Sequence, residues 1–296
     1  MTDDWIHGGK TPQARTVLIF GNCQVPFLAM MLAALDDLND DYRFVFVPNH
    51  PLPGEAVARP AGEEHLRDVA LLLSQFEDRA DNPAAQALRA RLPAGCPVVT
   101  FPSFIMNSIW PFECPEPRGQ AEPRYPWKRY PLGDMVGLQV AQLGLTGAIA
   151  VAAYLDLSRR KMPDLQVRLQ RDVERMHWYD TRCDVKLADY VLANFQRQHF
   201  FWTAGHLCED AVVELARRVA TAARPYLGGG VQRMEACLAG ARGFGGMGDH
   251  QHPIHPMVVD ALGLAFGQPD HSYRWYSQNW TFCEYIERYI GWDADW

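Results

Sequence analysis

Val17-Leu-Ile-Phe-Gly-Asn-Cys-Gln-Val-Pro-Phe27 joins a short apolar strand to an apolar-faced helix, and this junction sets the fold class. Val17–Phe20 is rich in strand-forming residues, a Gly-Asn pair permits a sharp turn, and Phe27–Leu35 has the apolar face of a helix. Cys23 and Gln24 therefore fall at the helix N-terminus, where backbone N–H groups and the helix dipole favour a thiolate, an oxyanion or a phosphate. This corner suits a nucleophile.

The next part of the chain repeats the alternation of strand and helix. Apolar runs at Tyr42–Val47, Val69–Ser74 and Pro97–Phe101 predict three further strands, and the Ala-rich Asn82–Leu92 predicts a helix with Asn at its N-cap. From Leu132 onward the patterns are mostly helical. We predict an α/β protein: a parallel sheet of about four strands in the N-terminal part, with a mostly helical C-terminal part packed on it.

Polar side chains follow the carboxyl ends of the four predicted strands. Cys23, His50, Gln75 and Ser103 each come just after one of them. The carboxyl ends of parallel strands lie at one edge of a sheet, and ligands bind beyond that edge. We therefore expect these four side chains to line one crevice.

Composition and charge narrow the class of protein. The 296 residues are 48% hydrophobic and 21% charged, as in soluble globular proteins, and the net charge of −7 argues against a general binder of nucleic acid or membrane surfaces. No apolar run reaches the roughly 18–20 residues of a membrane span, and the polar N-terminus does not resemble a signal peptide. The seven cysteines form no CxxC pair. We expect a cytoplasmic protein with reduced thiols.

A proline-rich segment divides the chain. Prolines recur through Trp110–Pro131 and exclude a helix or a central strand there. We interpret the segment as a long surface excursion, or else as a lid that covers a substrate. Residues 1–131 then form the α/β part with the Gly-Asn-Cys-Gln corner, and residues 132–296 the mostly helical part with the His-containing motifs. These parts form either two domains or one compact domain.

A nucleophilic cysteine needs a base, and two groups of histidines are candidates. His206 lies on a loop directly before the amphipathic helix predicted at Cys208–Ala223, so it can face a cleft while the packed helix holds it in place. His252 and His255 form a second group, in which the HxxH spacing together with Asp249 suggests metal ligands. The interrupting prolines favour a structural corner there, and we predict no metal.

Two short motifs are similar to those of SGNH-type esterases. Gly21-Asn-Cys23 is similar to the Gly-Asp-Ser corner that ends their first strand, and Asp249-x-x-His252 is similar to their late Asp-x-x-His. This similarity leaves an esterase or deacylase that uses Cys23 as an alternative function.

A longer resemblance runs through most of the chain. Phe20-Gly-Asn-Cys-Gln24 resembles the opening motif of the WcbI-type polysaccharide-biosynthesis acetyltransferases. Later segments resemble that family in the same order: Val69–Gln75, Phe101–Phe104 with Trp110-Pro111, Asn194–Ala216, Pro253–Pro256 and Tyr285–Ile290. One departure is that Leu207, rather than Pro, follows His206.

The resemblance implies a coenzyme A-dependent acetyltransferase for capsule or surface polysaccharide, with an α/β portion joined to helices. Its partners are then an acyl-CoA donor and a carbohydrate acceptor, with no nucleic acid and no membrane span. We expect Cys23 and His206 to be catalytic. We expect a second group to bind substrate or cofactor: Gly21, Asn22, Gln24, His50, Gln75, Ser103, Phe104 and His255.

Two versions of acyl transfer from acetyl-CoA, or another acyl-CoA, to a sugar hydroxyl follow. In one, Cys23 takes the acyl group as a thioester and His206 then activates the acceptor. In the other, His206 is the base for direct transfer, and the Cys23–Gln24 corner donates backbone N–H groups to the oxyanion. Besides the esterase, the sequence leaves open a non-catalytic protein that binds glycans or nucleotides, which its nine tryptophans favour.

Overall fold

The computed structural model divides the chain into two compact units. Unit 1 holds Met1–Phe104, Glu174–Leu192 and His206–Met247, and unit 2 holds Ile105–Val173, Ala193–Gly205 and Gly248–Trp296. These boundaries differ from the expected division after residue 131, because the chain returns to each unit more than once. The structure describes residues 6–35, 37–51, 56–77, 82–119, 122, 124–125, 128–229, 231–240 and 248–292.

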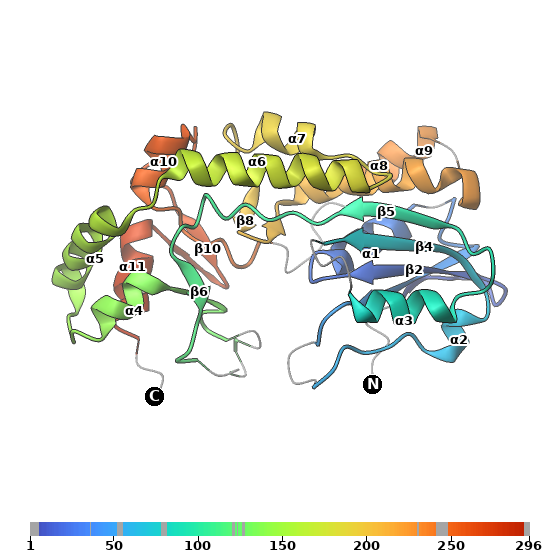
Figure 1. The fold of residues 1–296 in the computed structure, drawn as a ribbon, viewed down its shortest axis with the longest axis horizontal. Coiled ribbons are helices and arrows are strands. Elements are labelled where there is room, and N and C mark those ends of the chain that lie inside the picture. Colours follow the sequence, from blue (N-terminus) through green and yellow to red (C-terminus); the bar gives the residue numbers. More distant parts are fainter. Residues whose placement is uncertain are drawn as a thin grey trace. The chain divides into compact units, whose positions relative to one another are not determined.

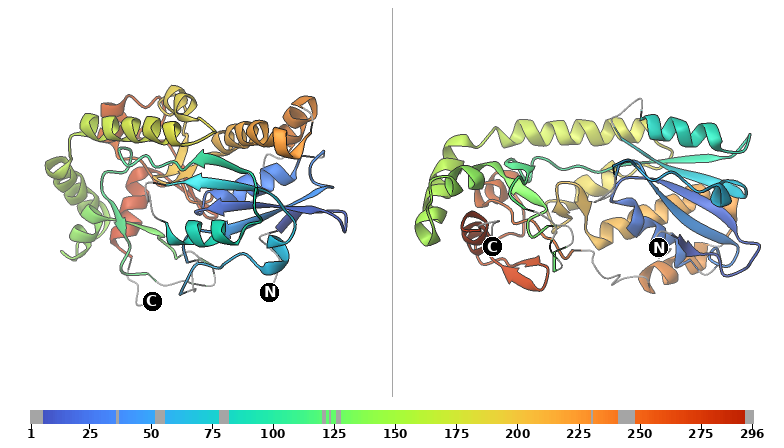
Figure 2. Two further views of the ribbon diagram at one scale, coloured as in Figure 1. Left: turned by 45° about the vertical axis from the view of Figure 1, so that its right-hand side comes forward. Right: turned by 90° about the horizontal axis from the view of Figure 1, so that it is seen from below.

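A five-stranded sheet forms the centre of unit 1, in the order β1-β3-β2-β4-β5 (Figures 1 and 2). The four strands expected from the sequence are all present and parallel, which confirms the α/β class. The three-residue strand β1, which pairs antiparallel to β3, was not predicted. The strands are β1 (Ile6–Gly8), β2 (Arg15–Gly21), β3 (Tyr42–Pro48), β4 (Val69–Phe76) and β5 (Val98–Pro102).

Helices cover both faces of this sheet (Figure 1). α1 and α8 pack against each other, α1 also against β3, and α8 against β4 and β5. On the opposite face a core cluster joins Leu18 and Leu72 of the sheet to Leu66 of α2 and Leu88 of α3. The helices are α1 (Val25–Ala33), α2 (Glu63–Leu66), α3 (Pro83–Arg91) and α8 (Glu209–Leu227), with α9 (Val231–Gly240) packed on α8.

Local sequence explains these helices. The Asn82 side chain caps α3 by accepting hydrogen bonds from two backbone N–H groups, as expected. α8 buries ten residues: residues 211–216 are buried on all sides of the helix, and beyond them one buried face remains, as its amphipathic pattern predicts.

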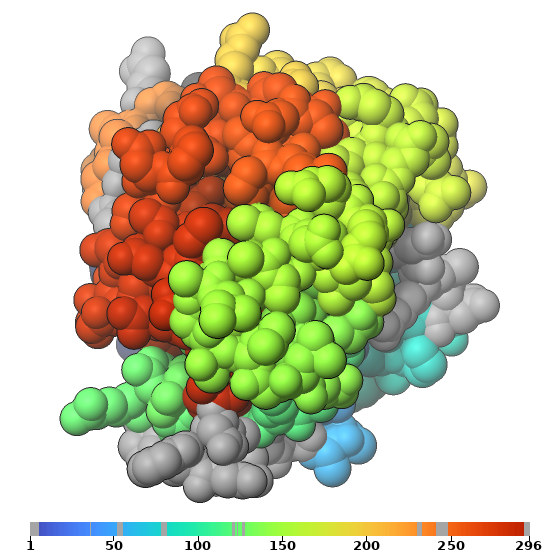
Figure 3. Space-filling view, turned by 90° about the vertical axis from the view of Figure 1, so that its left-hand side faces the viewer, coloured from blue at the N-terminus to red at the C-terminus, as the bar shows by residue number. Residues whose placement is uncertain are grey.

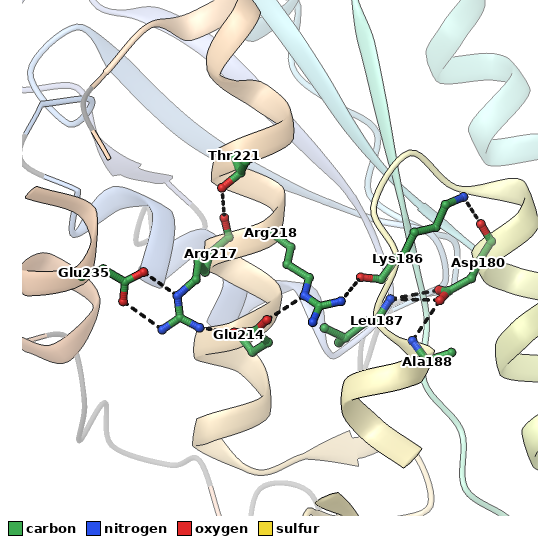
Figure 4. Close-up of polar contacts among 9 residues, drawn as sticks. All are labelled: Asp180, Lys186, Leu187, Ala188, Glu214, Arg217, Arg218, Thr221 and Glu235. Atoms are coloured by element: carbon green, nitrogen blue, oxygen red, sulfur yellow. Dashed lines mark hydrogen bonds and ion pairs between the residues drawn. The ribbon is translucent and has the colours of Figure 1, made fainter. Parts of the chain in front are cut away.

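A polar network fixes α8 to its neighbours within unit 1. Figure 4 shows the Glu214 carboxylate between Arg217 and Arg218 of the same helix. Arg217 also pairs with Glu235 of α9 at 2.6 Å, and Arg218 donates to the Lys186 carbonyl at 2.6 Å. Because these bonds leave α8 in different directions, they hold the helix against rotation as well as sliding.

Unit 2 is built around an aromatic core. α11 packs on α4 and α5, and Figure 3 shows α5 beside the C-terminal residues on this face of the molecule. The helices are α4 (Met135–Ala141), α5 (Gly147–Lys161), α10 (Pro256–Leu262) and α11 (Phe282–Ile290), and the short strands are β6 (Glu113–Pro115), β7 (Leu132–Asp134), β8 (Phe201–Thr203), β10 (Tyr273–Trp275) and β11 (Gln278–Trp280). Helices α6 (Leu165–Arg182) and α7 (Ala188–Asn194) carry residues of both units.

The proline-rich segment is not a simple surface excursion. Trp110, Phe112 and Tyr130 are buried. Strand β6 lies within the segment and pairs with β7, which follows the segment directly. The prediction was wrong because it weighed the prolines, which exclude long regular elements, above the large aromatic side chains between them. No helix in the described part of the chain is long and apolar enough to cross a membrane.

Candidate functional site

The two residues expected to be catalytic meet in unit 1. Cys23 lies on the corner between β2 and α1, and its Sγ is 3.3 Å from His206 Nε2. His206 begins the two-residue strand β9 (His206–Leu207), directly before α8. Since α8 packs against α1, two segments 183 positions apart in the sequence are brought together. This distance is within the range at which a base can take the proton of a nucleophilic thiol.

An amide network holds the corner on the neighbouring strands. The Gln24 side chain donates to the Phe104 carbonyl at 2.7 Å and accepts from the Phe104 N–H at 3.2 Å. Gln75 at the end of β4 donates to Gln24 Oε1 at 3.0 Å and accepts from the Asn22 N–H at 2.9 Å. Gln24 and Gln75 are both buried, so these bonds position the corner rather than face a ligand.

The Glu77 carboxylate also supports the corner. Glu77, just past the end of β4, accepts from Asn22 Nδ2 at 2.6 Å and from Asn49 Nδ2 at 2.9 Å. One side chain thus ties the Cys23 corner to the end of β3. The sequence reasoning missed Glu77 and Asn49; their position after strand ends was the available signal.

Gly21 is required where β2 turns toward α1. A Cβ added at this position would lie 2.4 Å from Val25 Cγ2 and 2.6 Å from Gln75 Oε1. Both distances are shorter than van der Waals contact, so any side chain would push the corner away from β4.

Cys23 is a neutral thiol rather than an activated thiolate at neutral pH. Burial of the surrounding site raises the pKa of the thiol to about 11, the Cys23 N–H lowers it, and the Glu77 carboxylate raises it, although part of the residue is exposed to solvent. The expectation that the helix N-terminus would lower this pKa was wrong. The thiol therefore needs a base to become a nucleophile, and His206 lies within reach.

Most backbone N–H groups of the corner already have acceptors. The Asn22 N–H is bound by Gln75, the Gln24 N–H by Asn22 Oδ1 at 3.0 Å, and the Val25 N–H by the Asn22 carbonyl at 3.0 Å. The Cys23 N–H faces its own sulfur. The expected pair of oxyanion donors from Cys23 and Gln24 is thus not available in this arrangement, because the Asn22 side chain occupies the second donor.

Comparison with known proteins agrees with this fold and corner. Residues 16–224 match the family described as polysaccharide biosynthesis enzyme WcbI, which is more than half of the chain. The chain belongs to the WcbI family. It is therefore a member of a family of polysaccharide biosynthesis enzymes, as the sequence resemblance predicted. No match was found among curated proteins.

A solved structure supports the fold over nearly the whole chain. It is described as WcbI, a polysaccharide biosynthesis enzyme, in its native form without a disulfide bond between coenzyme A and a cysteine. The similarity has a TM-score of 0.64 at 17% sequence identity and covers 95% of this chain and 90% of that one. The matched WcbI-family region contains both Cys23 and His206.

Other residues expected at the site have different surroundings. His50 is half-buried after β3, and its ring contacts the Pro51 carbonyl at 2.8 Å. Ser103 and Phe104 are buried, and Phe104 serves the corner through its backbone. The sequence could not show how the surroundings of these three residues differ, because all three follow strands of the same sheet.

The second histidine group lies in unit 2 and has local partners. His255 caps α10 by accepting from the Met257 N–H at 3.1 Å, and its Nε2 is 2.8 Å from Ser158 Oγ. Burial lowers the pKa of His255 to about 4. The structural corner expected for this motif is therefore present. No cluster of three or more metal-ligating side chains occurs among the described residues.

Proposed function

We propose that this chain transfers an acyl group from an acyl-CoA, with acetyl-CoA as the leading donor, to a carbohydrate hydroxyl. The observation that carries the proposal is the 3.3 Å separation of Cys23 Sγ from His206 Nε2. A thiol whose pKa is raised to about 11 forms little nucleophilic thiolate at neutral pH. The neighbouring imidazole therefore acts as the base that removes the thiol proton.

In the first half-reaction Cys23 becomes acylated. His206 Nε2 accepts the thiol proton while Cys23 Sγ attacks the thioester carbon of the donor. As the bond between that carbon and the CoA sulfur breaks, His206 returns the proton to the departing CoA thiolate. The products are a Cys23 thioester and free CoA thiol, with the imidazole again neutral.

In the second half-reaction His206 acts on the acceptor. The imidazole takes the proton of a sugar hydroxyl as its oxygen attacks the Cys23 thioester carbon. Cys23 then leaves as a thiolate and recovers the proton from His206, and the sugar carries an ester. Because each proton moves to or from one imidazole, a single base serves both steps.

Two findings support the donor and the acceptor. The related structure is described as native protein without a disulfide bond between coenzyme A and a cysteine, which favours coenzyme A as the carrier of the donor group. Cys23 is a free cysteine that is exposed to solvent. The family's role in polysaccharide biosynthesis favours a carbohydrate as the acceptor.

A transfer assay with radiolabelled acetyl-CoA and oligosaccharides of surface polysaccharide tests the proposal. We expect labelled sugar from the intact chain and a loss of at least about a hundredfold in Cys23→Ala and His206→Ala, since each removes a group of the covalent pathway. Full activity in Cys23→Ala would refute the pathway. Release of free acetate with no labelled sugar would instead identify the esterase alternative.

A further inference from the structure

A small pocket in unit 2 has neither Cys23 nor His206 in its lining. Its volume is about 30 Å³, and it lies between the Trp110–Glu113 segment, the loop of His252 and His255, and helices α5 and α11. Aromatic rings make up much of the wall, including Phe112, Tyr154 and Phe282. This volume admits one or two water-sized groups.

Two polar atoms in the wall lack hydrogen-bond partners within the described part of the chain. They are His252 Nδ1 and Glu113 Oε2, which lie 3.7 Å apart. The His252 side chain is 7% exposed. Because unpaired buried polar atoms are costly, a pair that faces one pocket indicates a missing polar group.

The neighbours of His252 fix its orientation and its tautomer. Its ring stacks on Trp275, and its backbone bonds Trp202 and Trp110 on either side. Tyr285 Oη is 3.0 Å from His252 Nε2, and burial keeps the pKa of this phenol well above its usual value. A neutral phenol can donate to Nε2, and the tautomer that this selects carries the imidazole proton on Nδ1, 3.7 Å from Glu113 Oε2.

We propose that this pocket binds a hydroxyl group of a carbohydrate, held between His252 and Glu113. The hydroxyl oxygen accepts from His252 Nδ1–H and donates its own proton to Glu113 Oε2, so both unpaired atoms gain a partner. A hydroxyl, whether of an alcohol or of water, both accepts and donates at one oxygen, and the binding experiment below separates the two. An anion is disfavoured by the carboxylate, and an ammonium by the Nδ1 proton.

The size and the lining of the pocket limit which part of a sugar it can hold. About 30 Å³ holds a hydroxyl or a hydroxymethyl tip, while the rest of the sugar stays outside. The aromatic rings of the wall suit the C–H groups that flank such a tip. The inference rests on these contacts and does not require acyl transfer, so the site stands whether or not Cys23 is a nucleophile.

Saturation-transfer NMR on the full chain tests this site, with glucose, mannose, galactose and N-acetylglucosamine as probes. Cys23→Ala serves as the background, so that no turnover occurs. We expect saturable binding of at least one sugar. In Glu113→Gln the affinity should fall about tenfold or more, because a charged acceptor is lost while the side-chain shape is kept.

Glu287→Gln is the matched control, since Glu287 is exposed on α11 of the same unit. It should bind as the background does. Melting temperatures of the variants show whether Glu113→Gln remains folded. The site would be refuted by the absence of saturable binding for all four sugars, or by binding that Glu113→Gln changes less than twofold; the pocket would then hold a structural water.

Discussion

Gly21 decides whether the corner that carries Cys23 can lie against β4. In Gly21→Ala the new Cβ would collide with Val25 and Gln75. We expect the free energy of unfolding to fall by about 1–3 kcal/mol, the usual cost of overpacking, and Cys23 to lose its contact with His206. Urea unfolding measures the first effect.

Gly240→Ala is the control for this change. A Cβ at Gly240 meets nothing within 4 Å. Because Gly240 ends α9, Ala there should leave the unfolding free energy unchanged or raise it by up to about 1 kcal/mol, whereas Gly21→Ala should lower it. Equal effects of the two substitutions would show that Gly21 has no special steric role.

The raised pKa of Cys23 predicts slow alkylation at neutral pH. Only the thiolate reacts, so the rate of iodoacetamide modification should climb as pH rises toward about 11. Glu77→Gln removes a negative charge that raises this pKa, and should speed alkylation several-fold at pH 8. Mass spectrometry of the Cys23 peptide gives the rates, with Glu64→Gln as a control. A rate that is already constant at pH 7 would contradict the assigned pKa.

The sequence was sufficient to select Cys23 and His206, whose side chains lie 3.3 Å apart, but not to predict their surroundings. Cys23 was predicted because a strand–turn–helix corner is a local pattern, and His206 because it precedes a strongly amphipathic helix. Glu77 was not, because its role depends on three strand ends that meet only in the folded sheet. The expected lowering of the Cys23 pKa was wrong for a related reason: burial in the folded site, together with the Glu77 carboxylate, raises this pKa more than the Cys23 N–H lowers it.

At the scale of elements, α8 follows His206 directly and packs on α1, which follows Cys23. Glu214 of α8 accepts from both Arg217 and Arg218 and is nearly buried. We expect Glu214→Gln to lower the free energy of unfolding by about 1–3 kcal/mol, because two guanidinium groups lose a charged acceptor. Glu235→Gln, whose carboxylate is about half-exposed, should cost less than about 1 kcal/mol. Chemical denaturation separates them, and the reverse order would contradict the assigned role of Glu214.

Element prediction succeeded where a pattern was long or well capped. Strands β2 to β5 and the capped helix α3 have continuous apolar runs or a clear N-cap. β1, with three residues, and the β10–β11 hairpin are too short for a periodic signal. They exist because neighbouring strands and helices supply their partners.

At the scale of the whole molecule, buried histidines predict instability in acid. Burial lowers the pKa of His255 to about 4 and that of His199 to about 3. The folded state thus keeps these rings neutral while the unfolded chain takes up protons below about 6.5, so stability is full above that pH and is lost as pH falls toward 4. His255 alone accounts for about 2–3 kcal/mol at pH 4.5.

His255→Asn tests this pH dependence. Asn can still cap α10, but it does not titrate. The loss of unfolding free energy between pH 7 and pH 4.5 should therefore be smaller by about 2–3 kcal/mol in this variant. An unchanged loss, measured by urea unfolding at the two pH values, would show that His255 is not responsible.

The division into two interleaved units was beyond sequence reasoning. A boundary was placed at the proline-rich segment because composition changes there, whereas the chain leaves unit 1 after Phe104 and returns to it at Glu174 and His206. The points at which the chain returns to a unit depend on tertiary packing, and no local sequence pattern indicates them. The consequence is that Cys23 and His206 share a unit despite their distance in sequence.

The most direct test of the proposed function is the mass of the Cys23 peptide after rapid mixing with acetyl-CoA and acid quenching. We predict one added acetyl group on Cys23 in the intact chain, removal of that group when an acceptor sugar is added, and little acetylation in His206→Ala. Transfer of acetyl to sugar with Cys23 unmodified at every time point, and at an undiminished rate in Cys23→Ala, would contradict it.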